Sequence, residues 1–338
     1  MSDLSEQGHE FEVAVSAVQA AGVICREVQR RLVDADSMEK KDKSPVTVAD
    51  YASQAIVCGL LAESFEGVAV IGEEDSADLQ KVENTGLRDT VVELVNGLLD
   101  EPMSAEEVLR WIDVGGADPV GRNMYWTLDP IDGTKGFLRR EQYAIALAKI
   151  EQGELTMGVL GCPNMQLAPR KAGGIDATGV LITAVKGQGA CIAPMAGNVH
   201  QVTEIRVSDV DDLAKAKFCE SVESGHSNQS QSAEIAAKLG ITTEPFRIDS
   251  QCKYAAIARG DAEIYLRLPT RKDYQEKIWD HGAGAMAVME AGGTVTDVYG
   301  KPLDFSKGKT LSANKGVIAT NGKFHDQVVM AVGEVLGV

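Results

Sequence analysis

The sequence is short of positive charge, because 33 lysines and arginines stand against 50 acidic residues and give a formal net charge of −17 at pH 7. A protein that binds nucleic acid needs a basic face, so we expect no nucleic-acid partner. The same charge repels anionic small molecules. If the substrate carries phosphate, bound cations and a few lysine or arginine side chains must reverse the local field.

Long hydrophobic runs and closely paired cysteines are also missing. Charges break every apolar stretch well before the length of a membrane span, and the opening residues, Met1–Glu6, lack the basic start and apolar run of a signal peptide. We therefore expect no membrane partner and a place in the cytoplasm or in the interior of an organelle. Buried thiols in a reducing compartment are favoured over a disulfide framework or a zinc site, since no CxxC pair occurs among Cys25, Cys58, Cys162, Cys191, Cys219 and Cys252.

An acidic cluster set in an apolar frame is the most informative motif that is present. The hexapeptide DPIDGT, residues 129–134, follows the strand-like run Tyr125–Leu128, so Asp129 should stand where a buried strand ends. We expect the proline to end that strand and to turn the chain. Asp129, Asp132 and the Ile131 carbonyl would then face one point and offer the oxygen ligands that ions of the Mg²⁺ type prefer. A solvated acidic turn is the alternative for the hexapeptide alone.

Three acidic residues elsewhere fit the same kind of site. The apolar run Val68–Gly72 delivers Glu73 at its end, as the earlier run delivers its aspartate. Asp280 lies at the start of a small, apolar, helix-like stretch. Asp50 opens another helix-like stretch after a loop at residues 44–47. Taken in isolation, an aspartate at a helix start is more often an N-cap than a ligand, and this alternative stays open for both Asp280 and Asp50.

Periodic patterns predict two elements near these motifs. Residues 143–150 and 155–161 read as the two strands of a hairpin behind the acidic hexapeptide. A helix near the N-terminus is indicated by the three- and four-residue spacing of Val18, Ala21, Cys25, Val28 and Leu32.

These motifs, in their order and spacing, resemble the metal signatures of the inositol monophosphatase superfamily. The segments that carry the resemblance are SPVTVAD at 44–50, GEE at 72–74, LDPIDGTKGFL at 128–138 and Trp279-Asp280. Within the superfamily, the second half resembles the 3′(2′),5′-bisphosphate nucleotidase branch through GHS at 225–227, IDSQCKY at 248–254, YLRLP at 265–269 and YQEKIWD at 274–280. Cys252 and Arg140 depart from the residues common in the branch, which bears on substrate affinity rather than on reaction type.

The resemblance implies an α/β fold, a layered αβαβα sandwich with an α+β N-terminal half, an α/β C-terminal half and the site between them. A Pro- and Gly-containing stretch at residues 194–198 suggests a boundary near residue 200. We expect a metal-site subdomain at 1–200 and a nucleotide-binding subdomain at 201–338. Residues 75–121 contain acidic, helix-like pieces without a motif, and we assign them no chemistry.

The resemblance further implies hydrolysis of a phosphate monoester with two or three Mg²⁺ ions. One ion would be held by Glu73, Asp129 and the Ile131 carbonyl, and a second by Asp129, Asp132 and Asp280. Glu73 would also help to hold a third, looser ion. Asp50 would act as the base through a hydrogen bond to Thr134, which orients the attacking water. Backbone amides of Gly133 and Thr134 would cradle the reacting phosphate.

The implied substrate is adenosine 3′,5′-bisphosphate, with 3′-phosphoadenosine 5′-phosphosulfate as a second candidate, which places the protein in nucleotide metabolism and sulfur assimilation. His226, Ser250 and Lys253 should contact the sugar side and the 5′-phosphate that does not react. Arg267 should lie beside the adenine or a phosphate, and Asp280 close to the substrate. Inhibition by lithium is a trait of the family.

Two other functions stay open from the sequence. An inositol polyphosphate 1-phosphatase would keep the same metal residues without the nucleotide contacts. A non-catalytic, metal-responsive binding protein would need a broken base or metal ligand, yet all of the expected ones are present. We expect a monomer in either case.

Overall fold

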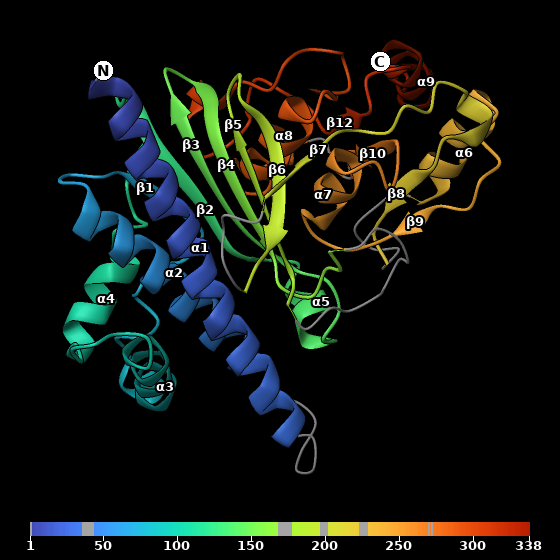
Figure 1. Ribbon diagram of the computed structural model, residues 1–338. Helices are drawn as coiled ribbons and strands as arrows, with labels where there is room; N and C mark the ends of the chain where they lie inside the picture. Colours follow the sequence, from blue (N-terminus) through green and yellow to red (C-terminus); the bar gives the residue numbers. More distant parts are fainter. Residues whose placement is uncertain are drawn as a thin grey trace.

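Two β-sheets, separated and flanked by helices, form the described part of the chain (Figure 1), which comprises residues 2–35, 44–167, 178–196, 202–222, 229–269, 271 and 273–338 of the computed structural model. The first sheet has seven strands in the order β1-β2-β3-β4-β5-β6-β7. Only β1 and β2 pair in parallel, and every other neighbouring pair in this sheet is antiparallel. The strands are β1 (Val70–Gly72), β2 (Met124–Asp132), β3 (Ala144–Glu151), β4 (Glu154–Cys162), β5 (Val180–Val185), β6 (Gly189–Pro194) and β7 (Thr203–Ile205).

The second sheet has five strands in the order β11-β12-β10-β8-β9. Its strands are β8 (Phe218–Glu220), β9 (Phe246–Arg247), β10 (Ile264–Arg267), β11 (Thr294–Thr296) and β12 (Val317–Thr320). Successive side chains of β10 enter different cores: Ile264 and Leu266 pack on one face of the sheet and Tyr265 packs on the other. Both faces of this sheet are therefore covered.

Helices fill the three remaining layers. On one face of the first sheet, α1 (Ser2–Ala35) crosses β3 and β4, and α2 (Ser44–Ser64) crosses β2, with α3 (Thr85–Asn96) and α4 (Ala105–Asp113) packed on α2. Between the sheets lie α7 (Cys252–Ala258) and α8 (Gly282–Glu290). The outer face of the second sheet is covered by α6 (Gln229–Leu239) and α9 (His325–Leu336). The expected αβαβα sandwich is confirmed.

The apolar patterns read from the sequence correspond to buried faces. On α1, Val18, Ala21, Cys25 and Val28 are all buried, so the predicted N-terminal helix is confirmed. The predicted hairpin is β3 and β4. Because helices cover both faces of the first sheet, β3 is buried at seven successive positions and reads as an almost continuous apolar run.

Two sequence-based boundaries need comment. Residues 44–47 were expected to be a loop, but they form the first turn of α2, where Pro45 is tolerated because the first turn needs no backbone N–H donor from it. Asp50 therefore lies inside a helix instead of opening one. The division of the chain at residue 200 stays a prediction. The first sheet extends to β7, and the second begins at β8.

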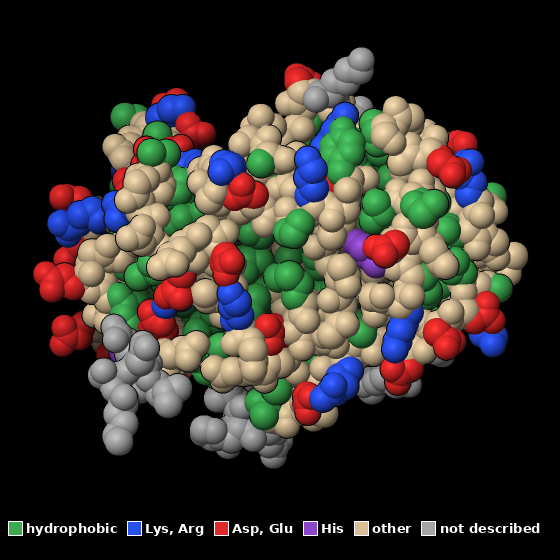
Figure 2. All heavy atoms as spheres, turned by 90° about the horizontal axis from the view of Figure 1, so that it is seen from above, with side chains coloured by type: hydrophobic (Ala, Val, Ile, Leu, Met, Phe, Trp, Pro, Cys, Tyr) green, Lys and Arg blue, Asp and Glu red, His purple; other side chains and the backbone are tan. Residues whose placement is uncertain are grey.

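Surface charge is mixed on the face seen in Figure 2, where acidic and basic side chains alternate around hydrophobic ones. Three short 3₁₀ turns at Val82–Asn84, Leu213–Lys215 and Phe305–Lys307, together with the five-residue helix α5 (Thr134–Leu138), complete the described elements. Within the described ranges, no helix has the length and apolar character needed to cross a membrane.

Candidate active site

Two carboxylates lie where neighbouring strands meet an edge of the first sheet. β1 and β2 run parallel, with Gly72 paired to Leu128. The next residues, Glu73 and Asp129, therefore lie at the same end of the two paired strands. In α/β folds, ligands commonly bind at this end. Both side chains line one pocket. The expected strand end before Glu73 agrees with the structure, in which β1 ends at Gly72.

β2 does not end at Pro130, as the sequence led us to expect, but continues to Asp132. Its pairing with β3 is irregular between Asp129 and Asp132 and resumes with Asp132 opposite Ala144. In an unbroken strand, residues three apart point to opposite faces. A bulge re-aims side chains, so both aspartates can line the same pocket. Pro130 is tolerated at such a break because no ladder hydrogen bond is needed from it.

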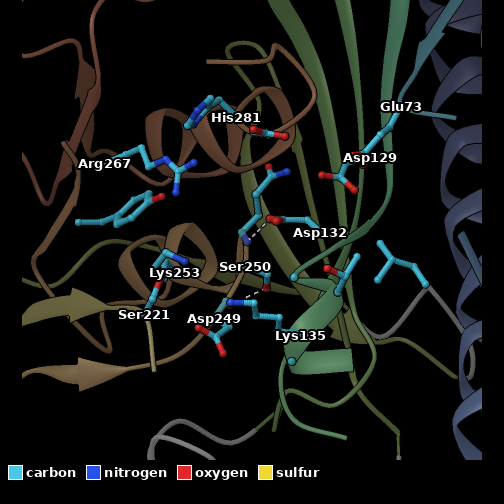
Figure 3. Close-up of a pocket in the computed structure, with 17 residues that line it drawn as sticks. Glu73, Asp129, Asp132, Lys135, Ser221, Asp249, Ser250, Lys253, Arg267 and His281 are labelled. Atoms are coloured by element: carbon cyan, nitrogen blue, oxygen red, sulfur yellow. Dashed lines mark hydrogen bonds between the residues drawn. The ribbon is translucent and has the colours of Figure 1, made fainter. Parts of the chain in front are cut away.

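The pocket has a volume of about 250 Å³. Figure 3 shows Glu73 and Asp129 on the side of the first sheet, Asp132 near the middle, and Lys253, Arg267 and His281 on the opposite side. Every predicted site residue lines this pocket except Asp50 and His226. Asp50 belongs to α2 and does not line the pocket. His226 lies outside the described residues.

The carboxylates of the pocket are electrostatically strained in the absence of a cation. Burial raises the pKa of Asp129 well above its usual value, and repulsion from Glu73 and Asp132 adds to the effect. The surrounding protein, followed by repulsion from Asp280, raises the pKa of Glu73 to about 7, even though part of this side chain is open to solvent in the pocket. Burial raises the pKa of Asp280 to about 6. These groups therefore hold protons that ordinary surface carboxylates would release.

A divalent cation fits this arrangement. Asp129 is 3% exposed, and its Oδ1 has no hydrogen-bond partner among the described residues. An orphaned, buried carboxylate oxygen is costly unless it binds a cation. Hard ions of the Mg²⁺ type prefer such oxygens, and Ile131 lines the same pocket. The donor set is therefore that of a site for a hard metal ion.

A second acidic group lies beside the predicted ligands. Within the described chain, only Glu276, Asp280 and His281 bring three potential ligand atoms within 4.8 Å of one another. The other predicted carboxylates share the pocket without converging that closely. In the trio, His281 Nε2 lies 3.2 Å from Glu276 Oε2, and Arg267 Nε lies 3.3 Å from the same oxygen. Glu276 thus already has two partners in the protein.

The predicted link between Asp50 and Thr134 is not formed. Asp50 is 7% exposed, and its Oδ1 has no hydrogen-bond partner within the described ranges. Burial raises the pKa of its carboxyl group well above the usual value, and repulsion from Glu74 and Glu73 contributes. Thr134 is the first residue of α5 and is exposed in the pocket. The sequence had suggested that Asp50 opens a helix, but α2 begins at Ser44, so Asp50 extends from within the helix.

The two halves of the chain come very close beneath the pocket. Gly133 has φ 93°, and a Cβ added there would meet Ser250 Cβ at 2.8 Å. Ser250 itself has φ 64°, an uncommon conformation for a residue with a side chain. Such outliers persist only where the surrounding structure fixes them. A side chain at position 133 is therefore excluded by both backbone strain and contact.

Two cationic side chains face the carboxylates. Lys253, on α7, is 7% exposed, and its Nζ lies 5.3 Å from the centre of the Tyr265 ring. Among described residues, no carboxylate lies within ion-pairing distance of this ammonium group, and burial lowers its pKa while Asp132 opposes that shift. Arg267, at the end of β10, is held by Glu276. The pocket thus has two opposed sides. We call them the acidic wall, formed by Glu73, Asp129, Asp132 and Asp280, and the basic wall, formed by Lys253 and Arg267.

Several residues of the site escaped the sequence reasoning. Glu276 and Gln251 lie within segments that carry the resemblance, but they were given no role. Gln54, on α2, is fully buried and clamps the residue after Glu73: its Nε2 donates to the Glu74 carbonyl at 2.6 Å, and its Oε1 accepts from the Glu74 N–H at 3.1 Å. A buried glutamine is unusual enough to draw notice, but the sequence cannot say what it binds.

Comparison with known proteins agrees with this geometry. Residues 6–336 match the inositol monophosphatase family. A 3′(2′),5′-bisphosphate nucleotidase from Emericella nidulans is 42% identical over 96% of this chain and 97% of its own length, and one from Oryza sativa is 43% identical over 97% and 94%. Among solved structures, inositol monophosphatase from Anabaena is similar in fold, with a TM-score of 0.63 and 20% identity over 97% of both chains. The IMPase from Thermotoga maritima has a TM-score of 0.61 and 19% identity over 100% of this chain and 99% of that one.

Proposed function

The chain belongs to the inositol monophosphatase family, and on this premise we propose that it hydrolyses the 3′-phosphate of adenosine 3′,5′-bisphosphate to AMP and inorganic phosphate with the help of Mg²⁺. The observation that carries the proposal is the pocket itself, in which a cluster of carboxylates, with Asp129 buried among them, faces Lys253 and Arg267. The carboxylates suit a divalent ion, and the two cations suit a second phosphate on the same small molecule.

The metal would be held by the acidic wall. Glu73, Asp129 and the Ile131 carbonyl would bind one ion, and Asp129, Asp132 and Asp280 a second, with Glu73 helping a third. Bound Mg²⁺ would supply the positive charge that favours ionisation of a water and neutralises the leaving oxygen. The carboxylates give up their protons to take the ion, since their raised pKa values reflect burial and mutual repulsion in its absence.

Hydrolysis needs an acceptor for the proton of the attacking water. As the water oxygen bonds to phosphorus, the bond between phosphorus and the 3′-oxygen breaks, and that oxygen leaves as an alkoxide that takes up a proton from solvent water. Asp50 is a suitable acceptor because a carboxylate with a raised pKa is a stronger base than usual. We assign the contact with water to Thr134 and expect its hydrogen bond to Asp50 to form when substrate is bound, since catalytic hydrogen bonds often tighten at that stage. Gly133 and Thr134 would offer their backbone N–H groups to the phosphate.

The basic wall would select the substrate. Lys253 keeps its ammonium group buried without an ion pair from the described chain, so an anionic ligand would relieve the cost of burial. Ser250, Arg267 and His226 would complete the contacts to the sugar, base and 5′-phosphate. The same geometry would accept 3′-phosphoadenosine 5′-phosphosulfate, which keeps the 3′-phosphate. Lithium inhibition, a monomeric state and a reducing compartment also belong to the proposal.

An inositol polyphosphate 1-phosphatase is the second candidate, because it would use the same acidic wall. Release of inorganic phosphate by the purified chain should be measured on adenosine 3′,5′-bisphosphate, adenosine 3′-monophosphate and inositol 1,4-bisphosphate, each with Mg²⁺ and with excess chelator. We expect the adenosine bisphosphate to be preferred and the chelator to abolish turnover. Preference for the inositol substrate would move the assignment to the second candidate. Absence of release from every substrate would revive a non-catalytic binding role.

A further inference from the structure

Gln251 makes hydrogen bonds to both sides of the proposed metal site. It precedes α7 and is 1% exposed. Its backbone N–H donates to the carboxylate of Asp132, which belongs to β2. Its side-chain Nε2 donates to the carbonyl of Trp279 at 2.9 Å, and its Oε1 accepts from the N–H of Gly284 at 3.0 Å. One residue therefore binds elements from opposite halves of the chain.

The partners of Gln251 determine where Asp280 lies. Trp279 is the residue immediately before Asp280, and Gly284 lies in the first turn of α8, which begins just after it. The hydrogen bonds to Trp279 and Gly284 hold the chain on both sides of Asp280 and so restrict the directions in which its carboxylate can point. Asp132 lies in the same pocket and accepts a hydrogen bond from the backbone N–H of the same Gln251. The distance between these two proposed ligands thus depends on one buried residue.

The side chain required at position 251 is specific. It must donate one hydrogen bond and accept another, and glutamate lacks the donor while asparagine is shorter by one methylene group. Because Gln251 is buried, either backbone partner would be left unsatisfied by an apolar replacement. The amide of Gln54 clamps Glu74, next to Glu73, in the same two-way manner. Both ligand-bearing loops are thus held by a buried glutamine amide.

We infer that Gln251 is a positioning residue, which sets Asp280 against Asp132 so that the two can share one divalent cation. The inference rests on the proposed function, because it takes these aspartates as metal ligands. Hydrogen-bonded partners behind metal ligands typically change metal affinity by about 10- to 100-fold when they are lost. Gln251→Met keeps the length of the side chain and removes both amide hydrogen bonds. The variant should therefore lower the affinity for the ion shared by Asp132 and Asp280 by about 10- to 100-fold.

Binding of Mn²⁺, used as a probe for the divalent site, should be measured directly by calorimetry and by electron paramagnetic resonance on the full chain without substrate. We expect Gln251→Met to weaken one class of sites and to leave the class at Glu73 and Asp129 near the wild-type affinity. In turnover assays, excess Mg²⁺ should restore kcat, with KM for the nucleotide unchanged. A merely structural role would lower the melting temperature without this dependence on metal concentration.

The matched control is Asn321→Leu, because Asn321 is also a buried amide, 2% exposed, and donates to the Val210 carbonyl at 2.8 Å in a region that does not line the pocket. It should lower the melting temperature and leave Mn²⁺ affinity unchanged. Equal weakening by the control, or wild-type affinity in Gln251→Met, would overturn the inference while leaving the proposed function intact. If Gln251→Met does not fold, Gln251→Asn gives the same decision, because it adds no charge and its shorter side chain cannot keep both amide hydrogen bonds. Failure of the wild type to bind Mn²⁺ would instead overturn the metal assignment itself.

Discussion

Removing the charge of Lys253 is the sharpest test of substrate choice. The Lys253→Met variant keeps a long side chain beside Tyr265 and loses only the ammonium group, which lies buried on the basic side of the pocket. A hydrogen bond to a charged group contributes about 1.5–3 kcal/mol, and each 1.4 kcal/mol is about a factor of ten. We therefore expect kcat/KM for adenosine 3′,5′-bisphosphate to fall by about one to two orders of magnitude.

The comparison substrate is adenosine 3′-monophosphate, which lacks the second phosphate. Its slow hydrolysis should be nearly unchanged in Lys253→Met, because the acidic wall is intact. The melting temperature should not fall, since burial already lowers the pKa of this ammonium group and its removal relieves a desolvation cost. Lys186→Met is a suitable control, because Lys186 forms an exposed ion pair with Glu154 on the β4–β5 side of the first sheet, outside this pocket. Equal losses on both substrates would refute the reasoning and make Lys253 structural.

Three further predictions concern the acidic wall. Asp132→Asn keeps the shape of the side chain but removes a ligand charge, so turnover should fall by several orders of magnitude with the fold intact, and wild-type kcat in saturating Mg²⁺ would contradict two-metal catalysis. Asp50→Asn and Thr134→Ala should each lower kcat more than they raise KM, and the double variant should be little worse than either alone; additive losses would show that the pair does not act as a unit. Without metal, the pKa in the folded protein is raised to about 7 for Glu73 and to about 6 for Asp280, from ordinary values of 4.5 and 3.8. Protonation of these groups therefore stabilises the folded state fully at pH values below the ordinary pKa values, and this contribution is lost as the pH rises through about 6 to 7. Mg²⁺ replaces the protons, so its addition should raise the melting temperature more at about pH 8 than at about pH 5; equal shifts at both pH values would count against a metal at these carboxylates.

Local signals in the sequence were sufficient for the apolar runs that lead to two of the acidic residues. Glu73 and Asp129 each follow a short apolar run, and the parallel pairing of β1 with β2 brings them together. Lys253 and Arg267 were identified only through the resemblance, because a single cation on a helix or strand has no distinctive pattern of its own.

Long-range partners were beyond reach of the sequence. Gln251 bonds Asp132 across 119 positions and Trp279 across 28, and no periodicity reports such a contact. The bulge in β2 was missed because Pro130 also fits the end of a strand. Asp50 was misplaced because Pro45 is compatible with a loop as well as with the first turn of a helix. For Pro130 and Pro45, the same residue fits two local structures, and tertiary packing chooses between them.

The single parallel pair in the first sheet also bears on the order of folding. From β3 to β6, each strand pairs with the next along the chain, and short turns join β3 to β4 and β5 to β6. Pairing of β1 with β2 encloses the whole segment between Gly72 and Leu128, including α3 and α4, and contacts across long segments form slowly. We expect the mutually repelling carboxylates to meet only after the hairpins exist. Pulse-labelled hydrogen exchange should then protect the amides of β3 and β4 before those of β1, and simultaneous protection would show that the strands assemble together.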